Sequence, residues 1–335
     1  MSKTLPDAHP PAAHGSNLYT LLIFVSILLV LIVVVLSAYL RLAGSGLGCA
    51  EWPACYALIK SQGGSESLAA AHLVPPWATV IHRLVASTLG VLVLGIAVAV
   101  WRRRRQAEQH AWMTFAVLLL TVFLSVLGYK TPSPLLPWVT LSNLLGGMAM
   151  LAMLWWLGQR SVSSGVAAAQ ARGLRPWAVA GAGIVFFQIA LGGWVSANFA
   201  ALACTDLPGC GGYPWADGPW YESFNLLRVL PVTDGGAVIT GDTGKIIHLA
   251  HRLGAVFTFL YIGWLGWRAF SLGNRYRGAG IAILVFLLLQ IALGILAVMF
   301  SLPVTIVTGH NASAALLLLS VVNLIHRLTP PTGKR

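Results

Sequence analysis

Eight long runs of apolar residues are the feature of this sequence that most restricts its fold. A helix needs about 20 apolar residues to cross a hydrocarbon core about 30 Å thick. Backbone groups find no water in that core, so each crossing segment must satisfy its own hydrogen bonds as a helix. The expected spans are 19–40, 77–101, 111–128, 136–158, 176–197, 246–269, 279–300 and 304–326. The sequence therefore predicts an all-α polytopic membrane protein with eight transmembrane helices.

Composition agrees with a protein whose main solvent is lipid. Hydrophobic residues make up 57% of the chain, charged residues only 9%, and the mean hydropathy is +0.79. This leaves too little charge to cover the surface of a water-soluble domain. The net charge of +12 does not indicate nucleic acid, because the arginines lie in short clusters between apolar runs and form no basic stripe.

The basic clusters predict the orientation of the spans, because cytoplasmic loops carry an excess of Lys and Arg. Most of the chain's 21 Lys and Arg fall on one side, at Lys3, Arg102, Arg103, Arg104, Arg105, Arg160, Arg172, Arg175, Arg268, Arg275, Arg277, Arg327, Lys334 and Arg335. We therefore expect both termini in the cytoplasm and the chain in the inner (plasma) membrane of a bacterium. Residues 1–17 resemble neither a mitochondrial presequence nor a signal peptide and are expected to form a cytoplasmic tail.

All four cysteines lie in the two long loops that are predicted to face outward, 42–76 and 198–245. They form two pairs with the same spacing, Cys49 with Cys55 and Cys204 with Cys210. An outward loop of a bacterium is in an oxidising compartment, so two local disulfides are expected. The spacing leaves open whether these are loop staples or redox groups, and it does not suit a zinc site.

Repeated motifs predict two halves with the same topology. Each cysteine pair precedes a helix that opens with His-Arg-Leu, at His82 and at His251. The third and seventh spans each carry Leu-Gly, followed after fifteen or sixteen residues by Asn143 or His310. An even number of spans in each half makes the halves parallel, as two pseudo-symmetric four-helix bundles. The predicted segments are a tail (1–18), an N-terminal half (19–158), a cytoplasmic linker (159–175), a C-terminal half (176–326) and a second tail (327–335).

Four histidines, His82, His248, His251 and His310, lie near the outward ends of even-numbered spans. An ionisable group at that depth normally faces the bundle interior or a site, although a single membrane histidine is more often a packing residue than a ligand. His251 and His310 lie at matched depth on the sixth and eighth spans. Two imidazoles on facing helices are what six-coordinate haem iron binds axially. We therefore predict that both histidines are iron ligands, with His82 as the corresponding ligand of the first half.

Three neighbouring side chains are candidates for contacts with the same cofactor. Arg83 and Arg252 follow two of the histidines, and their guanidinium groups match the carboxylates of haem propionates. Snorkelling of both arginines to the membrane interface is an equally good interpretation. His248 lies one turn before His251 on the same face. It could orient a propionate, assist the chemistry or hydrogen-bond a loop.

The first half departs from this pattern at Asn143, the counterpart of His310. An amide is a poor ligand for haem iron. The first site is therefore either five-coordinate, with iron bound only by His82 and an open position for oxygen, or degenerate. The residues alone leave this choice open.

The chain resembles the haem A synthase family of bacterial and mitochondrial membranes, from Arg41 to about Arg327. The resemblance rests on Arg41-Leu-Ala-Gly-Ser-Gly-Leu-Gly-Cys49, Val80-Ile-His82-Arg83, Gln188-Ile-Ala-Leu-Gly-Gly-Trp-Val-Ser196, Cys204-Thr-Asp206, His248-Leu-Ala-His251-Arg252, Gln290-Ile-Ala-Leu-Gly294 and His310-Asn311. The order, spacing and duplication of these motifs make it specific.

The resemblance implies a b-type haem between His251 and His310 in the C-terminal half. It implies a haem O site in the N-terminal half, with His82 as the catalytic residue. There the C8 methyl group of haem O would be oxidised to a formyl group to give haem A, with molecular oxygen or water as a further reactant. Haem O synthase and terminal oxidase assembly factors are then expected partners besides membrane lipid, and oligomerisation of the chain stays open.

Three positions of the first half differ from the family pattern. Thr79 stands where the family usually has a glutamate, and Asn143 where it usually has a second histidine. Leu124 stands where a glutamine similar to Gln188 and Gln290 is expected. The enzyme stays the leading interpretation, and these differences raise an alternative, a haem-binding paralogue without enzyme activity that serves electron transfer or oxidase assembly. A transporter is a third interpretation, because transporters also use parallel repeats, but the spans carry few carboxylates.

Overall fold

The computed structural model describes residues 15–44, 76–102, 108–130, 136–162, 169–207, 209–231 and 238–330. Eight helices within these residues are long and apolar enough to cross a membrane. They are α1 (Gly15–Gly44), α3 (Pro76–Arg102), α4 (Glu108–Lys130), α5 (Pro137–Val162), α6 (Arg175–Ala197), α8 (Gly241–Ser271), α9 (Asn274–Met299) and α10 (Val304–Arg327). The prediction of an all-α polytopic membrane protein with eight spans is confirmed.

Two helices begin about one turn earlier than the hydropathy pattern predicts. Helix α8 starts at Gly241 instead of 246, and α9 starts at Asn274 instead of 279. The added turns carry polar residues, which a hydropathy window excludes but a helix accepts at its end. In the first turn of α8, Lys245 Nζ lies 3.0 Å from Asp242 Oδ1. In α9, the guanidinium of Arg277 lies 4.6 Å from the ring centre of Phe270.

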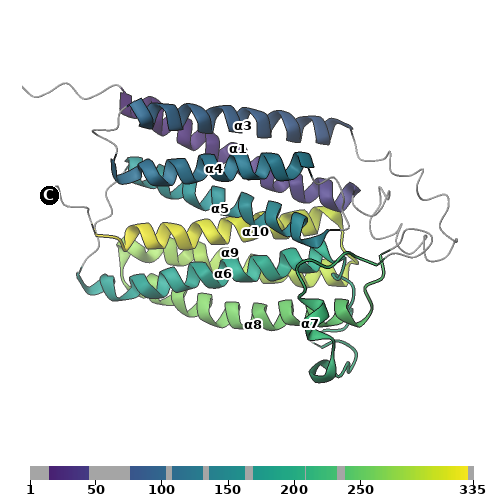
Figure 1. Cartoon of the computed structure of the whole chain (residues 1–335). Coiled ribbons are helices and arrows are strands. Elements are labelled where there is room, and N and C mark those ends of the chain that lie inside the picture. The colour runs from purple at the N-terminus through teal and green to yellow at the C-terminus, as the bar shows by residue number, and fades with distance from the viewer. Residues whose placement is uncertain are drawn as a thin grey trace, which may run out of the picture.

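The helices form one bundle in which the two halves of the chain lie side by side (Figure 1). Helix α1 packs against α3 and α5, and α4 packs against the same two helices. In the second half α8 lies between α6 and α9, and α9 packs against α10. The halves meet where α10 contacts α1 and α5 and where α5 contacts α6. The pseudo-symmetry of the halves and the predicted segment boundaries stay predictions.

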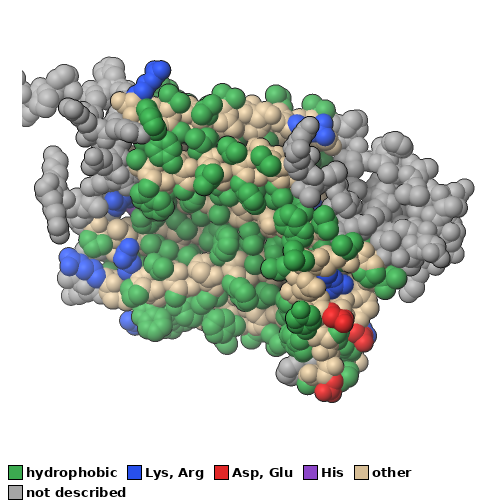
Figure 2. All heavy atoms as spheres, viewed as in Figure 1, with side chains coloured by type: hydrophobic (Ala, Val, Ile, Leu, Met, Phe, Trp, Pro, Cys, Tyr) green, Lys and Arg blue, Asp and Glu red, His purple; other side chains and the backbone are tan. Residues whose placement is uncertain are grey.

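The surface of the bundle is suited to lipid. Many large apolar side chains on the spans are exposed, including Leu119 at 71% and Val91 at 70%. In Figure 2 hydrophobic side chains cover the flank of the bundle, and Lys and Arg lie near its ends. Such a continuous apolar surface would aggregate in water, and it identifies a multi-pass membrane protein.

A compact loop structure closes one end of the bundle, which we call the α7 end after helix α7 (Trp220–Ser223). Helix α6 ends at Ala197 and is capped by Asn198, and Phe199 then turns the chain with a φ of 54°. The indole Nε1 of Trp194 donates to the carbonyl of Ser223 at 2.8 Å, which ties α7 to α6. The predicted Cys204–Cys210 disulfide is present in this loop. The predicted Cys49–Cys55 pair lies outside the described residues.

Candidate functional site

A cavity of about 360 Å³ lies inside the second half and extends toward the α7 end. Its walls come from α6, α8, α9 and α10, with further residues from α1 and α5. Most of the lining is apolar, as is usual for a site that holds a large organic cofactor. Its main polar groups are three imidazoles (His248, His251 and His310), two glutamines, two arginines and the amide of Asn311.

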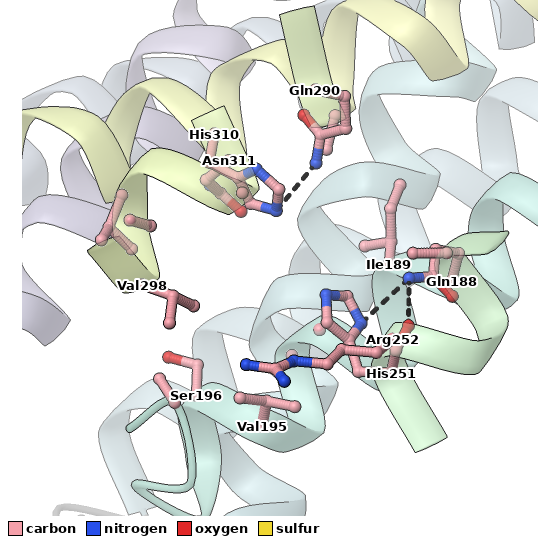
Figure 3. A pocket seen from close by; sticks show the side chains of 18 of the residues that line it. Gln188, Ile189, Val195, Ser196, His251, Arg252, Gln290, Val298, His310 and Asn311 are labelled. Carbon is pink, nitrogen blue, oxygen red and sulfur yellow. Dashed lines mark hydrogen bonds between the residues drawn. The ribbon is translucent and has the colours of Figure 1, made fainter. Parts of the chain in front are cut away.

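His251 of α8 and His310 of α10 point into this cavity from opposite sides (Figure 3). Both were predicted as iron ligands, and the structure brings them to one site. The matched depth of the two positions on neighbouring helices explains the arrangement. Two imidazoles on either side of an apolar space are suited to bind a flat metal cofactor axially.

Each of these imidazoles contacts a glutamine on an adjacent helix. Gln188 Nε2 of α6 lies 3.0 Å from His251 Nδ1 and 3.0 Å from the His251 carbonyl oxygen. Gln290 Nε2 of α9 lies 3.0 Å from His310 Nε2. Both contacts appear as dashed lines in Figure 3. The glutamines therefore fix the direction in which the two rings point.

A glycine four residues after each glutamine makes room for the ring. A Cβ added to Gly192 would lie 3.0 Å from Cε1 of His251, and a Cβ added to Gly294 would lie 3.0 Å from Cε1 of His310. The two glutamine–glycine pairs have the same sequence, Gln-Ile-Ala-Leu-Gly. This repeated pentapeptide builds the same ring cradle twice, once on α6 and once on α9.

Arg252 also lines the cavity, but its guanidinium is engaged by the loop at the α7 end. It donates to the backbone carbonyls of Asp206 and Cys204, each at 2.5 Å, and to that of Gly209. These carbonyls belong to the loop that the disulfide closes. The contacts show Arg252 holding this loop over the cavity, a role that the His-Arg-Leu motif did not indicate.

The other predicted residues of this group lie in different settings. His248 lines the cavity and is buried, with its Nδ1 lacking a hydrogen-bond partner among the described residues and its ring interacting with the backbone of Ala200. Arg83 is an exposed side chain on α3 and is not part of the cavity lining. The structure therefore brings His248, His251, Arg252 and His310 together and leaves Arg83 apart.

His82 lies on α3, six residues after Pro76, and is half-buried. Neither His82 nor Asn143 lines the cavity of the second half. Leu124 of α4 packs onto α5 one turn from Asn143, because a Cβ added to Gly146 would lie 2.6 Å from Cδ2 of Leu124. By the repeat, Leu124 corresponds to Gln290. A leucine–glycine contact in the first half thus stands where the second half has a glutamine–histidine contact.

Sequence reasoning did not assign the partners of the two histidines. Gln188 and Gln290 were visible only as parts of a family motif, although the identical pentapeptides in two different spans were a usable signal. Arg41 and Asn311 also line the cavity and had no assigned role. Nothing in the periodicity of α1 indicates that its end reaches the site of the second half.

Comparisons with known proteins identify the family of this chain. The COX15-CtaA family, described as cytochrome oxidase assembly protein, matches residues 20–322. A protein of Shewanella oneidensis named heme A synthase is 32% identical over 324 residues, which cover 91% of this chain and 95% of the relative. Heme A synthases of Caulobacter vibrioides and Rhizorhabdus wittichii are 25% and 23% identical, over 92% and 97% of this chain and 95% and 97% of their own lengths. The chain belongs to the COX15-CtaA family of cytochrome oxidase assembly proteins.

Proposed function

We propose that this protein is a haem A synthase, a membrane oxidoreductase that oxidises the C8 methyl group of haem O to a formyl group. Family membership and relatives named heme A synthase support the reaction. The observation that carries the proposal is the pair of imidazoles, His251 and His310, on opposite sides of one apolar cavity. The product would serve the assembly of terminal oxidases.

The second-half cavity fits a b-type haem. Its donor set of two neutral imidazoles suits haem iron, and the glycines beneath the rings leave no space for a larger side chain. The Oε1 atoms of Gln188 and Gln290 are buried without hydrogen-bond partners among the described residues. At His251 the Gln188 Oε1 can accept a hydrogen bond from Nδ1–H once the amide turns, which leaves Nε2 for iron. At His310 the iron would replace the Gln290 amide as the partner of Nε2.

The haem supplies one-electron chemistry when it is bound, and the surrounding residues fix its position. Conversion of a methyl group to a formyl group removes four electrons and adds one oxygen atom, from molecular oxygen or water. We assign this reaction to the first half, with His82 as the catalytic residue that binds the iron of haem O. The second-half haem b would exchange electrons with that site.

The proposed reaction also has a membrane location, an orientation and partners. The basic clusters support a bacterial inner membrane location with both termini in the cytoplasm. The α7 end, with its disulfide, would then face outward. Haem O synthase as the source of substrate and oxidase assembly factors as consumers of product are the partners that fit, and residues 19–158 and 176–326 would form the substrate half and the haem b half.

Haem extraction tests the function directly. We expect that a host lacking haem A, when it expresses this chain together with a haem O synthase, accumulates haem A or its hydroxylated intermediate. Acid–acetone extraction followed by chromatography and mass spectrometry identifies the haems. Cells with the haem O synthase alone are the control and should contain haem O and haem B only.

Absence of haem A in this experiment would favour the alternative function. Folded protein with a bis-histidine haem but no haem A, in a host whose electron donors support a known haem A synthase, would reject the enzyme. The substitutions at Thr79 and Asn143 would then mark a haem-binding paralogue that serves electron transfer or oxidase assembly.

Gln188→Leu tests the role of the glutamine contacts. We expect the variant to bind haem b through the same two histidines but to lose it about tenfold faster, as outer contacts to metal-binding histidines commonly change affinity by about that factor. Its midpoint potential should rise, because His251 loses a hydrogen bond that increases its electron donation to iron. Haem transfer to apomyoglobin and potentiometric titration measure the two effects.

Gln159→Leu is the matched control for this experiment. Gln159 lies on α5 outside the cavity, and its Nε2 is buried with no partner among the described residues. We expect unchanged haem retention and an unchanged potential in this variant. Equal effects of the two substitutions would contradict a specific role of Gln188.

A further inference from the structure

A guanidinium group from the first half of the chain lies in the wall of the second-half cavity. Arg41, near the end of α1, lines this cavity, and its Nε atom is buried with no hydrogen-bond partner among the described residues. None of the described residues that line the cavity is an Asp or a Glu. A buried cation is costly unless a counter-charge or hydrogen bonds compensate it. Within the described residues, the cavity wall thus presents a positive charge with no carboxylate beside it and no partner for Nε.

Packing of α1 on α10 fixes the place of this arginine. Asn311, next to His310, donates from Nδ2 to the carbonyl of Val34 at 3.5 Å. Arg41 follows Val34 by seven residues, which is about 10 Å further along α1 toward the α7 end. Its neighbours Ala38 and Leu42 are buried, at 1% and 7% exposure. The packing therefore places Arg41 between the level of the His310 imidazole and the α7 end.

The second arginine of the cavity, Arg252, already donates its hydrogen bonds to the protein and is less able to bind a ligand. The Arg252 guanidinium is bound to the carbonyls of Cys204, Asp206 and Gly209 in the disulfide loop. Releasing it would leave the three loop carbonyls without this donor, including that of the buried Cys204. Arg83 is exposed on α3 and does not line the cavity.

We propose that Arg41 binds a carboxylate group of the ligand in this cavity, which makes it a haem propionate if the proposed function is correct. A guanidinium presents parallel N–H donors that match the two oxygens of a carboxylate. The pair would compensate the buried charge. It would also attach the second-half haem to α1, a helix of the first half, so that the haem is held by both halves of the chain.

The test is a comparison of two cofactors in the full-length protein. Wild type, Arg41→Met, Arg41→Lys and Arg83→Met are prepared without haem in lipid nanodiscs and loaded with haem b or with its dimethyl ester, which has no carboxylates. Transfer to apomyoglobin gives the rate of cofactor loss. We expect Arg41→Met to lose haem b at least about tenfold faster than wild type, with a lower midpoint potential, and Arg41→Lys to lie between them. The dimethyl ester should leave wild type and Arg41→Met at similar rates.

Each other result has its own interpretation. Equal acceleration for haem b and for the ester would mean that Arg41 only supports the fold, and no acceleration would mean that it does not bind the propionate; either overturns the inference. Carboxylate-dependent loss in Arg83→Met but not in Arg41→Met would move the contact to Arg83 and also overturn it. Wild type that binds neither cofactor through two histidines would instead overturn the proposed function.

Discussion

Alanine in place of His251 or of His310 is expected to abolish the low-spin bis-histidine spectrum of the purified protein. Each substitution removes one of the two imidazoles that point into the cavity from α8 and α10. Iron with a single imidazole becomes high-spin or binds water, and most of the haem should be lost during purification. Absorption spectra of the reduced protein and electron paramagnetic resonance of the oxidised protein measure the change.

No neighbouring side chain is well placed to replace His251 or His310 as an iron ligand. His248 lies on the same helix as His251, but its ring is buried and interacts with the backbone of Ala200. The Gln290 amide beside His310 is a poor ligand for haem iron. A low-spin bis-histidine signal that persists in both alanine variants would therefore reject the second-half assignment.

His326→Ala is a matched control for these variants. His326 is also a buried histidine of α10, but it lies near the opposite end of the helix from His310 and packs edge-on against Trp156, with ring centres 5.7 Å apart. Its removal deletes an imidazole without touching the cavity lining. We expect the bis-histidine spectrum to survive, with some loss of thermal stability from the lost packing.

The spans and the two facing histidines could be predicted because the signals that specify them are local. Hydropathy over about 20 residues defines a membrane helix, whatever it packs against. The rise per residue then gives the depth of a side chain, which placed His251 and His310 at one level before their contacts were known. The Cys204–Cys210 disulfide followed in the same way from short spacing within one loop.

The partners of these residues could not be predicted, because they depend on which helices are neighbours. Arg252 follows His251 directly, yet its side chain reaches the carbonyls of a loop more than forty residues earlier. Gln188 contacts a histidine that lies sixty-three residues away in the sequence. Arg41 reaches the cavity only because α1 packs on α10. None of these contacts leaves a pattern within a single helix.

The packing of α4 on α5 explains one of the differences in the first half, Leu124. Leu124 in place of glutamine was an unexplained difference in the sequence. In the structure its side chain fills the space over Gly146, so an apolar contact replaces a polar one between α4 and α5. A glutamine at this position would reach toward Asn143, one turn away, as Gln290 reaches His310. The two differences, Leu124 and Asn143, thus lie on the packed helices α4 and α5, within about one turn of the same contact.

Alanine in place of His82 is expected to stop the conversion of haem O to haem A while the bis-histidine spectrum of the second half is kept. His82 does not line the second-half cavity, so its removal should leave His251, His310 and their haem unchanged. Under the proposed function it is the protein ligand that holds the iron of haem O in the first half. Haem extraction from the co-expression host and absorption spectra of the same membranes give both readouts.

Thr88→Ala is the control on the same helix, because Thr88 is exposed and its hydroxyl donates to the carbonyl of Leu84 within its own helix. We expect it to produce haem A at the wild-type level. A wild-type yield of haem A from His82→Ala would remove this residue from the mechanism.

The two histidine experiments together separate the roles of the halves. If haem b of the second half exchanges electrons with the first, His251→Ala should lose haem A production as well as its spectrum, whereas His82→Ala should lose production alone. Haem A production that survives the loss of the bis-histidine spectrum would show that the first half obtains its electrons elsewhere. The second-half haem would then have a role in stability or in oxidase assembly, and the Arg41 contact between the halves would be structural in its effect.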